Sequence, residues 1–172
     1  MPSMGTDTTD SIADGVRRPV DPRWIPVQRV HGLVFAGVMA FASFVAIVML
    51  AVASGLILVV FVLPLWALAM LALAWHMVRW PAIAYRFMSY QVDDAGLEIA
   101  RGVYWRTVVT VPLSRVQHTD VSQGPLERRF GLGTLVVYTA GTDQARVSLG
   151  GLAHAHALRI REQLLPRGDD AV

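Results

Sequence analysis

The pattern of hydrophobic and polar positions divides the chain into two parts of different character. From Gly32 to Trp75 no Asp, Glu, Arg or Lys interrupts a long apolar run. One helix needs about 20 residues to cross a bilayer, so this run is about long enough for two spans. The stretch "ASG" at 53–55 can close a tight turn between them. The sequence therefore predicts a transmembrane helical hairpin over residues 23–80, with helices at about 33–52 and 56–78.

Beyond residue 81 the apolar residues alternate with polar ones, which is typical of strands with one buried face. "DDAG" at 93–96 is a turn signal that follows a first strand in "RFMSYQV", and a hairpin should reverse within Gly102–Arg106. Further strands are expected at 116–121, 134–139 and 145–149, with "AGTD" turning between the last two. Apolar residues fall at odd positions from the first turn onward: Leu97, Ile99, Val103, Trp105, Val109, Val111 and Leu113.

The chain closes with a segment of helical period. Ala153, Ala157, Ile160 and Leu164 form one apolar stripe, and Pro166 with Gly168 should end the helix. Residues 81–166 are thus expected to form six or seven antiparallel strands capped by one helix, a partly closed barrel. The polar segments 1–22 and 167–172 lack periodicity and are expected to be disordered.

Composition and charge add a location to this architecture. The apolar share is 54%, and the absence of cysteine excludes disulfides, thiolate metal sites and cysteine nucleophiles. All 15 basic residues are arginine, which is typical of a high-GC bacterial genome. Arginines flank the predicted hairpin and are missing from its turn, so the positive-inside rule places both termini in the cytoplasm, with the hairpin in the bacterial inner membrane. The flanking arginines are Arg17, Arg18, Arg23 and Arg29 before the hairpin and Arg79 and Arg86 after it.

Two other interpretations of the apolar run fit less well. "AVA" at 51–53 resembles a signal-peptide cleavage site, but the apolar region before it exceeds the usual 7–15 residues. A transport pathway would need ionisable groups at mid-membrane depth, where the sequence instead has Pro64 and Trp66. A helix kink and packing against the first helix explain those two residues.

The order of two apolar helices, a strand-rich segment containing "VPLSRVQ" and "QGPLERRFGLGTL", then "VSLGGL" and a helix closely resembles the YdbS-like bacterial pleckstrin-homology (PH) domain membrane proteins. The resemblance covers roughly residues 23–165. It implies two nearly orthogonal antiparallel sheets in a partly open barrel capped by the C-terminal helix, and it implies no enzymatic activity. Phosphoinositide-binding PH domains carry basic residues between their first two strands. Here that loop is the acidic "DDAG", which disfavours an inositol-phosphate ligand.

The segment "SQGPLERRFG" is the candidate interaction surface. A turn at Gly124-Pro125 followed by one helical turn ending at Gly131 would place Leu126 and Phe130 on one face, as anchors to the barrel. The charged residues Glu127, Arg128 and Arg129 would then project outward, and two guanidinium groups can pair with lipid phosphates or with carboxylates of a partner. The predicted structural anchors of this loop are Gly124, Pro125, Leu126, Phe130 and Gly131.

Other polar clusters predict no catalytic, metal or cofactor site. His118 and Asp120 share a strand face without a third ligand, and His154 and His156 face apart on a helix. A net charge of +2 is too small for a nucleic-acid footprint. We therefore expect a non-enzymatic protein whose cytoplasmic PH-like domain serves protein–protein assembly. The expected partners are the lipid bilayer and another membrane protein. A second protein with PH-like domains is one candidate for that partner. The alternative is a module that senses anionic lipid through surface arginines.

Overall fold

The structure is a computed structural model that describes residues 14–54, 57–140 and 146–164. The chain divides into two compact units. One consists of Ile25–Ala84 and contains the helical hairpin. The other combines Met1–Trp24 with Tyr85–Val172 and contains the sheets.

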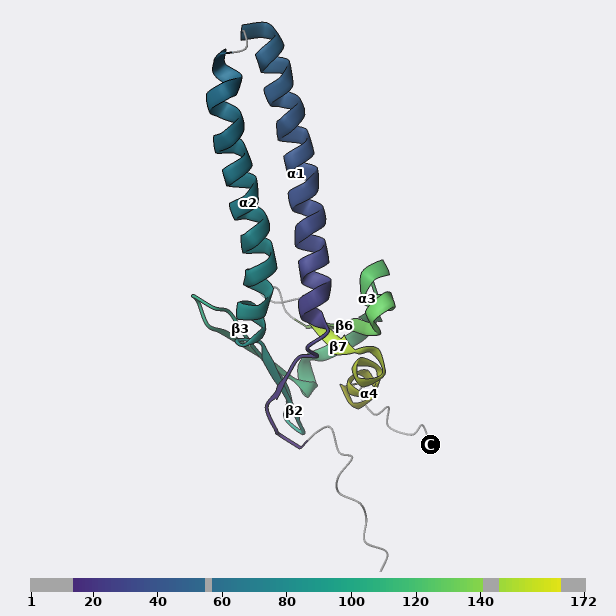
Figure 1. Cartoon of the computed structure of the whole chain (residues 1–172). Coiled ribbons are helices and arrows are strands. Elements are labelled where there is room, and N and C mark those ends of the chain that lie inside the picture. Colours follow the sequence, from purple (N-terminus) through teal and green to yellow (C-terminus); the bar gives the residue numbers. More distant parts are fainter. Residues whose placement is uncertain (1–13, 55–56, 141–145, 165–172) are drawn as a thin grey trace, which may run out of the picture. The chain divides into compact units, whose positions relative to one another are not determined.

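The hairpin consists of α1 (Trp24–Ser54) and α2 (Ile57–Tyr85), joined through residues 55–56, which lie outside the described part (Figure 1). Both are long and apolar enough to cross a membrane, with mean hydropathies of 2.6 and 1.9 over their candidate spans. The predicted helical hairpin is confirmed. Its helices extend beyond the apolar run, α1 on its N-terminal side and α2 on its C-terminal side, where α2 continues past Pro81 to Tyr85.

Contacts between α1 and α2 are both polar and apolar. The indole Nε1 of Trp66 donates a hydrogen bond of 2.9 Å to Ser43 Oγ, and the Trp66 ring lies 5.7 Å from that of Phe44. Gly32 lies close to Met77, and Arg29 Nε donates to the carbonyl oxygen of Val78 at 3.0 Å. Packing of Trp66 against the first helix is therefore as the sequence predicts.

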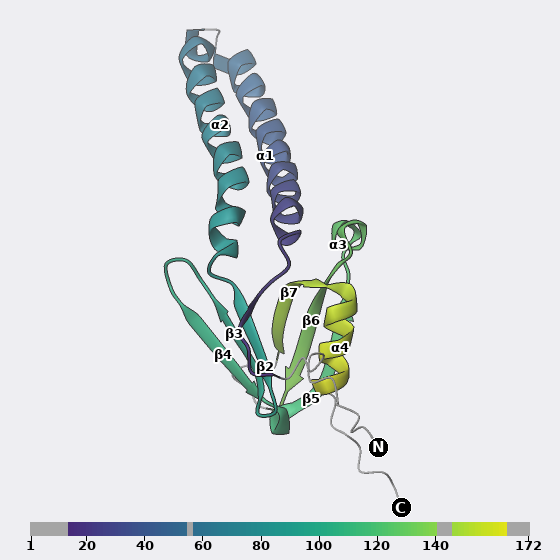
Figure 2. The same cartoon turned by 60° about the horizontal axis from the view of Figure 1, so that its bottom comes forward.

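The second unit holds two antiparallel sheets and two helices (Figure 2). One sheet has the order β1-β2-β3-β4 and the other the order β5-β6-β7, which confirms the predicted antiparallel architecture. The longer helix, α4, packs mainly on β5 and β6, so it caps the second sheet as expected. The elements are β1 (Arg18–Pro19), β2 (Ser89–Asp93), β3 (Gly96–Arg101), β4 (Thr107–Pro112), a 3-10 turn (Leu113–Arg115), β5 (Val116–Ser122), α3 (Pro125–Phe130), β6 (Leu132–Thr139), β7 (Arg146–Ala153) and α4 (His154–Leu164).

One hydrophobic core joins the two sheets and α4. The odd positions of β3 and β4 supply buried residues, as their alternation predicts, while α4 contributes three fully buried side chains from its apolar stripe. Trp105 is an exception: it shares the odd pattern but lies in the hairpin reversal and is 87% exposed. The core comprises Val20, Tyr90, Val92, Leu97, Ile99, Val109, Val111, Val116, Leu135, Val137, Val147, Leu149, Leu152, Ala157, Ile160 and Leu164.

The segment before α1 differs from the disordered stretch that its composition predicts. Within residues 14–22, β1 pairs with β2, the amide of Gly15 donates to the carbonyl of Val92 at 3.0 Å, and Val20 is 1% exposed in the core. A single buried valine creates no hydrophobic periodicity, so the sequence pattern does not show that this segment is ordered. Burial of that side chain and pairing of its neighbours offset the cost of ordering the segment. Residues 1–13 and 165–172, including the predicted helix stop at Pro166 and Gly168, lie outside the described residues, as does most of the "AGTD" turn.

Candidate interaction surface

The helix α3 is a single turn with well-defined ends. Pro125 follows the N-cap Gly124, and the amide of Arg128 donates to the carbonyl of Gly124 at 2.9 Å. Gly131 ends the helix in the left-handed conformation, with φ of 66°, and its amide donates to the carbonyl of Arg128 at 3.2 Å. Proline suits the first helical position, and only glycine takes up the left-handed end without strain. The sequence therefore determines this turn locally.

Glu127 does not project outward with its two neighbours. Its Oε2 accepts a hydrogen bond from the amide of Gly124 at 2.8 Å, and its Oε1 accepts one from Thr134 Oγ1 at 2.9 Å. Gly124 has no side chain, so Glu127 supplies one half of a capping box and also ties α3 to β6. The carboxylate thus serves the loop's structure, where the sequence pattern indicated a member of the exposed charged surface.

Arg128 and Arg129 are exposed, as expected. Among the described residues neither guanidinium has a hydrogen bond or an ion pair, so two positive charges are presented without a compensating carboxylate. Leu126 and Phe130 are partly buried, and neither belongs to the buried core, so their anchoring role stays a prediction. Polar contacts through Glu127 connect α3 to β6.

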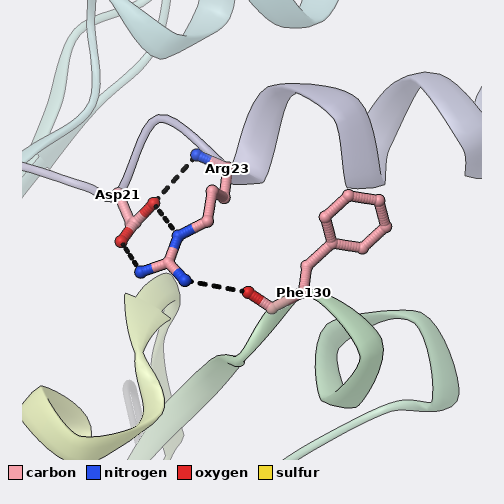
Figure 3. A network of polar contacts seen from close by, with 3 residues as sticks. All are labelled: Asp21, Arg23 and Phe130. Carbon is pink, nitrogen blue, oxygen red and sulfur yellow. Dashed lines mark hydrogen bonds and ion pairs between the residues drawn. The ribbon is translucent and has the colours of Figure 1, made fainter.

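A second tie to α3 comes from Arg23, far away in the sequence (Figure 3). Arg23 Nη1 donates to the carbonyl oxygen of Phe130 at 3.2 Å, while its Nε and Nη2 donate to the two carboxylate oxygens of Asp21 at 3.0 and 2.9 Å. These hydrogen bonds lower the pKa of the Asp21 carboxyl and raise the pKa of the Arg23 guanidinium. In the sequence Arg23 belongs only to the positive flank of the hairpin, because no local pattern marks a contact 107 residues away.

The hydrogen bond from Arg23 to Phe130 holds α3 at the edge of the domain that contains the connection into α1. The amide of Asp21 donates to the carbonyl of Gly151 at 2.8 Å, and the amide of His154 donates to the carbonyl of Gly131 at 3.0 Å. The connection into α1, the end of β7 and α3 therefore lie together. The exposed arginines belong to the edge of the domain at which the chain enters its first apolar helix.

The outer strands of the two sheets differ in how they are protected. β5 exposes Gln117, His118 and Asp120, and β7 exposes Arg146, so both carry polar or charged groups. The two-residue β1 contains proline. β4 (Thr107–Pro112) has no charged residue and has proline only at its last position. It pairs with β3 on one side and has no strand on its other side in the described part of the chain. We call this unpaired side of β4 the open edge.

The histidines have separate environments. His118 Nε2 lies 3.3 Å from Asp120 Oδ1, and both side chains are more than half exposed. His156 Nε2 lies 2.8 Å from the hydroxyl of the buried Tyr90, while His154 lies at the start of α4 near Gly133. No group of three or more metal-ligating side chains occurs within the ranges that the structure describes. The pairs singled out in the sequence are therefore not brought into a common site.

Comparison with known proteins identifies this combination of an apolar hairpin and a two-sheet domain. The profile of the family described as bacterial PH domain matches residues 30–167, most of the chain. The chain belongs to the bacterial PH domain family. Its sequence is also 34% identical over 84 residues to the UPF0699 transmembrane protein YdbS of Bacillus subtilis (strain 168). No solved structure matches significantly.

The match to YdbS covers 49% of this chain and 51% of the relative, so the chain spans about half the length of the relative it matches. The family and the two candidate spans establish a membrane protein with a bacterial PH domain, as the resemblance implies. Neither the family description nor the relative's name states a catalytic activity.

Proposed function

We propose that this membrane protein is non-enzymatic and presents its bacterial PH domain for protein–protein assembly, with another membrane protein as the partner. The observation that carries the proposal is the open edge of β4. A six-residue outer strand without charge, Thr107–Pro112, has a side with which no described strand pairs, and it carries the half-exposed Val108. Soluble domains usually blunt such edges with charge, proline or cover. An exposed sheet edge commonly binds a partner by pairing with an extended segment of it, which adds a strand to the sheet.

The attachment of the domain limits which partners it can reach. β1 ends at Pro19 and α1 begins at Trp24, while α2 ends at Tyr85 and β2 begins at Ser89. Tethers of a few residues hold the domain within a short distance of the bilayer surface. A partner that is itself a membrane protein shares that surface, and its effective concentration is correspondingly high.

We place the domain on the cytoplasmic side of the bacterial inner membrane. β1 precedes α1 and β2 follows α2, and the two strands pair with each other, which supports a hairpin that enters and leaves on one side. The arginines that flank the hairpin favour the cytoplasmic side for both ends.

The test is co-purification of the full-length protein from its native membrane in a mild detergent. Val108→Lys places a charge on the open edge, whereas His118→Lys places the same charge on the polar outer strand β5. We expect a specific membrane-protein partner to be lost with Val108→Lys and retained with His118→Lys. Retention of the partner by both variants would remove the open edge from the proposal, and absence of any partner from the unaltered protein would remove assembly.

A second candidate function, recognition of anionic lipid, is favoured by the exposed pair Arg128 and Arg129 at the edge where the chain enters α1. The Glu127 carboxylate accepts hydrogen bonds from Gly124 and Thr134, so it is directed to the base of the loop while the two guanidinium groups remain exposed. In nanodiscs, anionic lipid should slow hydrogen exchange of α3 relative to zwitterionic lipid, and salt should weaken the effect. The double variant Arg128→Ala, Arg129→Ala should lose the difference. Equal exchange in both lipids at low salt would reject this candidate.

A further inference from the structure

The tip of the hairpin between β3 and β4 presents two large aromatic side chains to the surroundings. Tyr104 is 81% exposed and Trp105 is 87% exposed. The tight turn at the tip requires Gly102, which has φ of 116°. A Cβ at this position would lie 1.9 Å from the carbonyl oxygen of Trp105 and would clash with it. Two adjacent aromatic rings held in this way form an apolar protrusion that has no role in the core of the domain.

The strand register fixes the edge of the domain from which this tip projects. Pro19 pairs with Ser89, Ser89 with Ala100, and Arg101 with Thr107. The C-terminal end of β1, the N-terminal end of β2 and the tip are therefore at the same end of the sheet. Both connections to the apolar helices also leave from this end, as Figure 2 shows within the domain.

The length of these connections limits the distance between this edge and the membrane. Only residues 20–23 separate β1 from α1, and only residues 86–88 separate α2 from β2. At about 3.5 Å per residue, neither can separate its strand from its helix by more than roughly 15–20 Å. The tip is therefore within reach of the headgroup region of the membrane that the helices cross.

The chemistry of the tip matches that region. Tryptophan and tyrosine concentrate at membrane–water interfaces, where the ring is partly apolar and its polar group stays hydrated. Arg101 and Arg106 flank the tip, both exposed, and can bind lipid phosphates. No acidic residue occurs from Arg101 through Pro112, whereas the opposite end of the sheet carries the acidic turn at Asp93-Asp94.

We propose that residues 103–106 at the tip of the β3–β4 hairpin insert into the headgroup interface of the same bilayer, giving the PH domain a membrane contact beyond the two helices. The contact orients the domain at the surface. It leaves the open edge of β4, which runs away from the tip, available to a partner, so it does not depend on the proposed assembly function.

The test uses the absence of cysteine from the chain. Val103→Cys places a single label beside the aromatic tip, and Ala95→Cys places a matched label at the exposed turn on the opposite end of the sheet. The full-length protein carries an environment-sensitive fluorophore at one of these positions, one copy per nanodisc of mixed zwitterionic and anionic lipid. Quenching is compared between iodide in water and nitroxide lipids labelled at the headgroup level.

We expect the label at 103 to be quenched by nitroxide lipid and protected from iodide, and the label at 95 to show the reverse. Adding Tyr104→Ser and Trp105→Ser should restore iodide quenching at 103, while a Val108→Lys control should leave both labels unchanged. Iodide quenching at 103 equal to that at 95 would overturn the proposal. Protection at 103 from both quenchers would also overturn it, since the tip would then be buried against protein.

Discussion

Glu127 shows how one side chain can differ from the charged run in which it lies. Its neighbours Arg128 and Arg129 are exposed, but its own carboxylate is held by the Gly124 amide and by Thr134. Glycine at the N-cap has no side chain to bond the first helical amides, so the cap of α3 is formed by the bond from the Gly124 amide to Glu127. The two guanidinium groups are therefore exposed, while the carboxylate between Gly124 and Thr134 holds the loop together.

Replacing Glu127 with alanine should therefore loosen α3. Loss of a capping contact costs about 1 kcal/mol, so the amides of residues 124–131 should exchange several-fold faster with solvent, by roughly a factor of 5. Hydrogen-exchange mass spectrometry of the full-length protein measures this directly. Arg128→Ala is the matched control and should leave the exchange of α3 unchanged. Equal protection in the Glu127→Ala variant would show that the carboxylate does not hold the turn.

The contact between His156 and Tyr90 predicts a pH dependence of stability. Burial lowers the pKa of the His156 imidazole, and the nearby Arg159 and Arg18 guanidinium groups lower it further. Burial also raises the pKa of the Tyr90 phenol, so both groups are neutral near pH 7, and the phenol oxygen and Nε2 share a hydrogen bond of 2.8 Å. Because α4 carries His156 and β2 carries Tyr90, this bond links the capping helix to the first sheet.

The sign of the pH dependence of stability follows from proton binding to His156. Below about pH 6.5 the unfolded chain protonates this histidine while the folded domain resists protonation, so the free energy of unfolding should fall as the pH decreases from 7. Thermal unfolding followed by circular dichroism in mild detergent measures the slope. His156→Gln, which cannot titrate, should flatten it. A midpoint that rises on acidification, or an unchanged slope in the variant, would contradict the assignment.

At the scale of elements, the sequence predicted what periodicity can reveal. The strands β3 and β4 follow from alternating apolar residues, and α4 follows from its stripe ending at Leu164. The cap of α3 follows from Pro125 and Gly131, whose conformational limits are local. Each of these elements is specified by residues that are close together in the chain.

The elements that the sequence missed depend on distant partners. β1 has two residues and is held by pairing with β2 and by one buried valine, so no window of the sequence contains its signal. The tie from Arg23 to the carbonyl of Phe130 has the same character. Trp105 matched the alternating pattern but falls in the reversal, because period alone does not say where a hairpin turns. These contacts join residues that are far apart in the chain, so no local sequence pattern predicts them.

The open edge of β4 gives a prediction at this scale. Val108 is 48% exposed, so Val108→Lys should change the free energy of unfolding by less than about 0.5 kcal/mol, as surface substitutions usually do. Thermal unfolding of the purified protein is the check. If Val108→Lys loses the partner but keeps its free energy of unfolding, the loss results from a changed docking surface and not from unfolding. A strongly destabilised one would mean that β4 is covered by the domain itself.

At the scale of the whole molecule, a hairpin of two apolar helices is joined to its PH domain by two short connections that leave from one edge of the domain. That edge carries the arginines of α3 and the aromatic tip, both suited to an anionic membrane surface. The open edge of β4 is formed by uncharged residues suited to pairing with another chain. We propose that the helices and the edge from which they leave attach the protein to the membrane, and that β4 serves assembly.

The most direct measurement is site-specific photo-crosslinking in the native membrane. A benzophenone amino acid replaces Thr110, exposed on β4, or His118, exposed on the outer strand β5, in the full-length protein. We expect a discrete adduct with another membrane protein from position 110 and none from position 118, and Val108→Lys should abolish the adduct. The same adducts from both positions, or no adduct from position 110 in a membrane that contains the intact protein, would contradict assembly through the open edge.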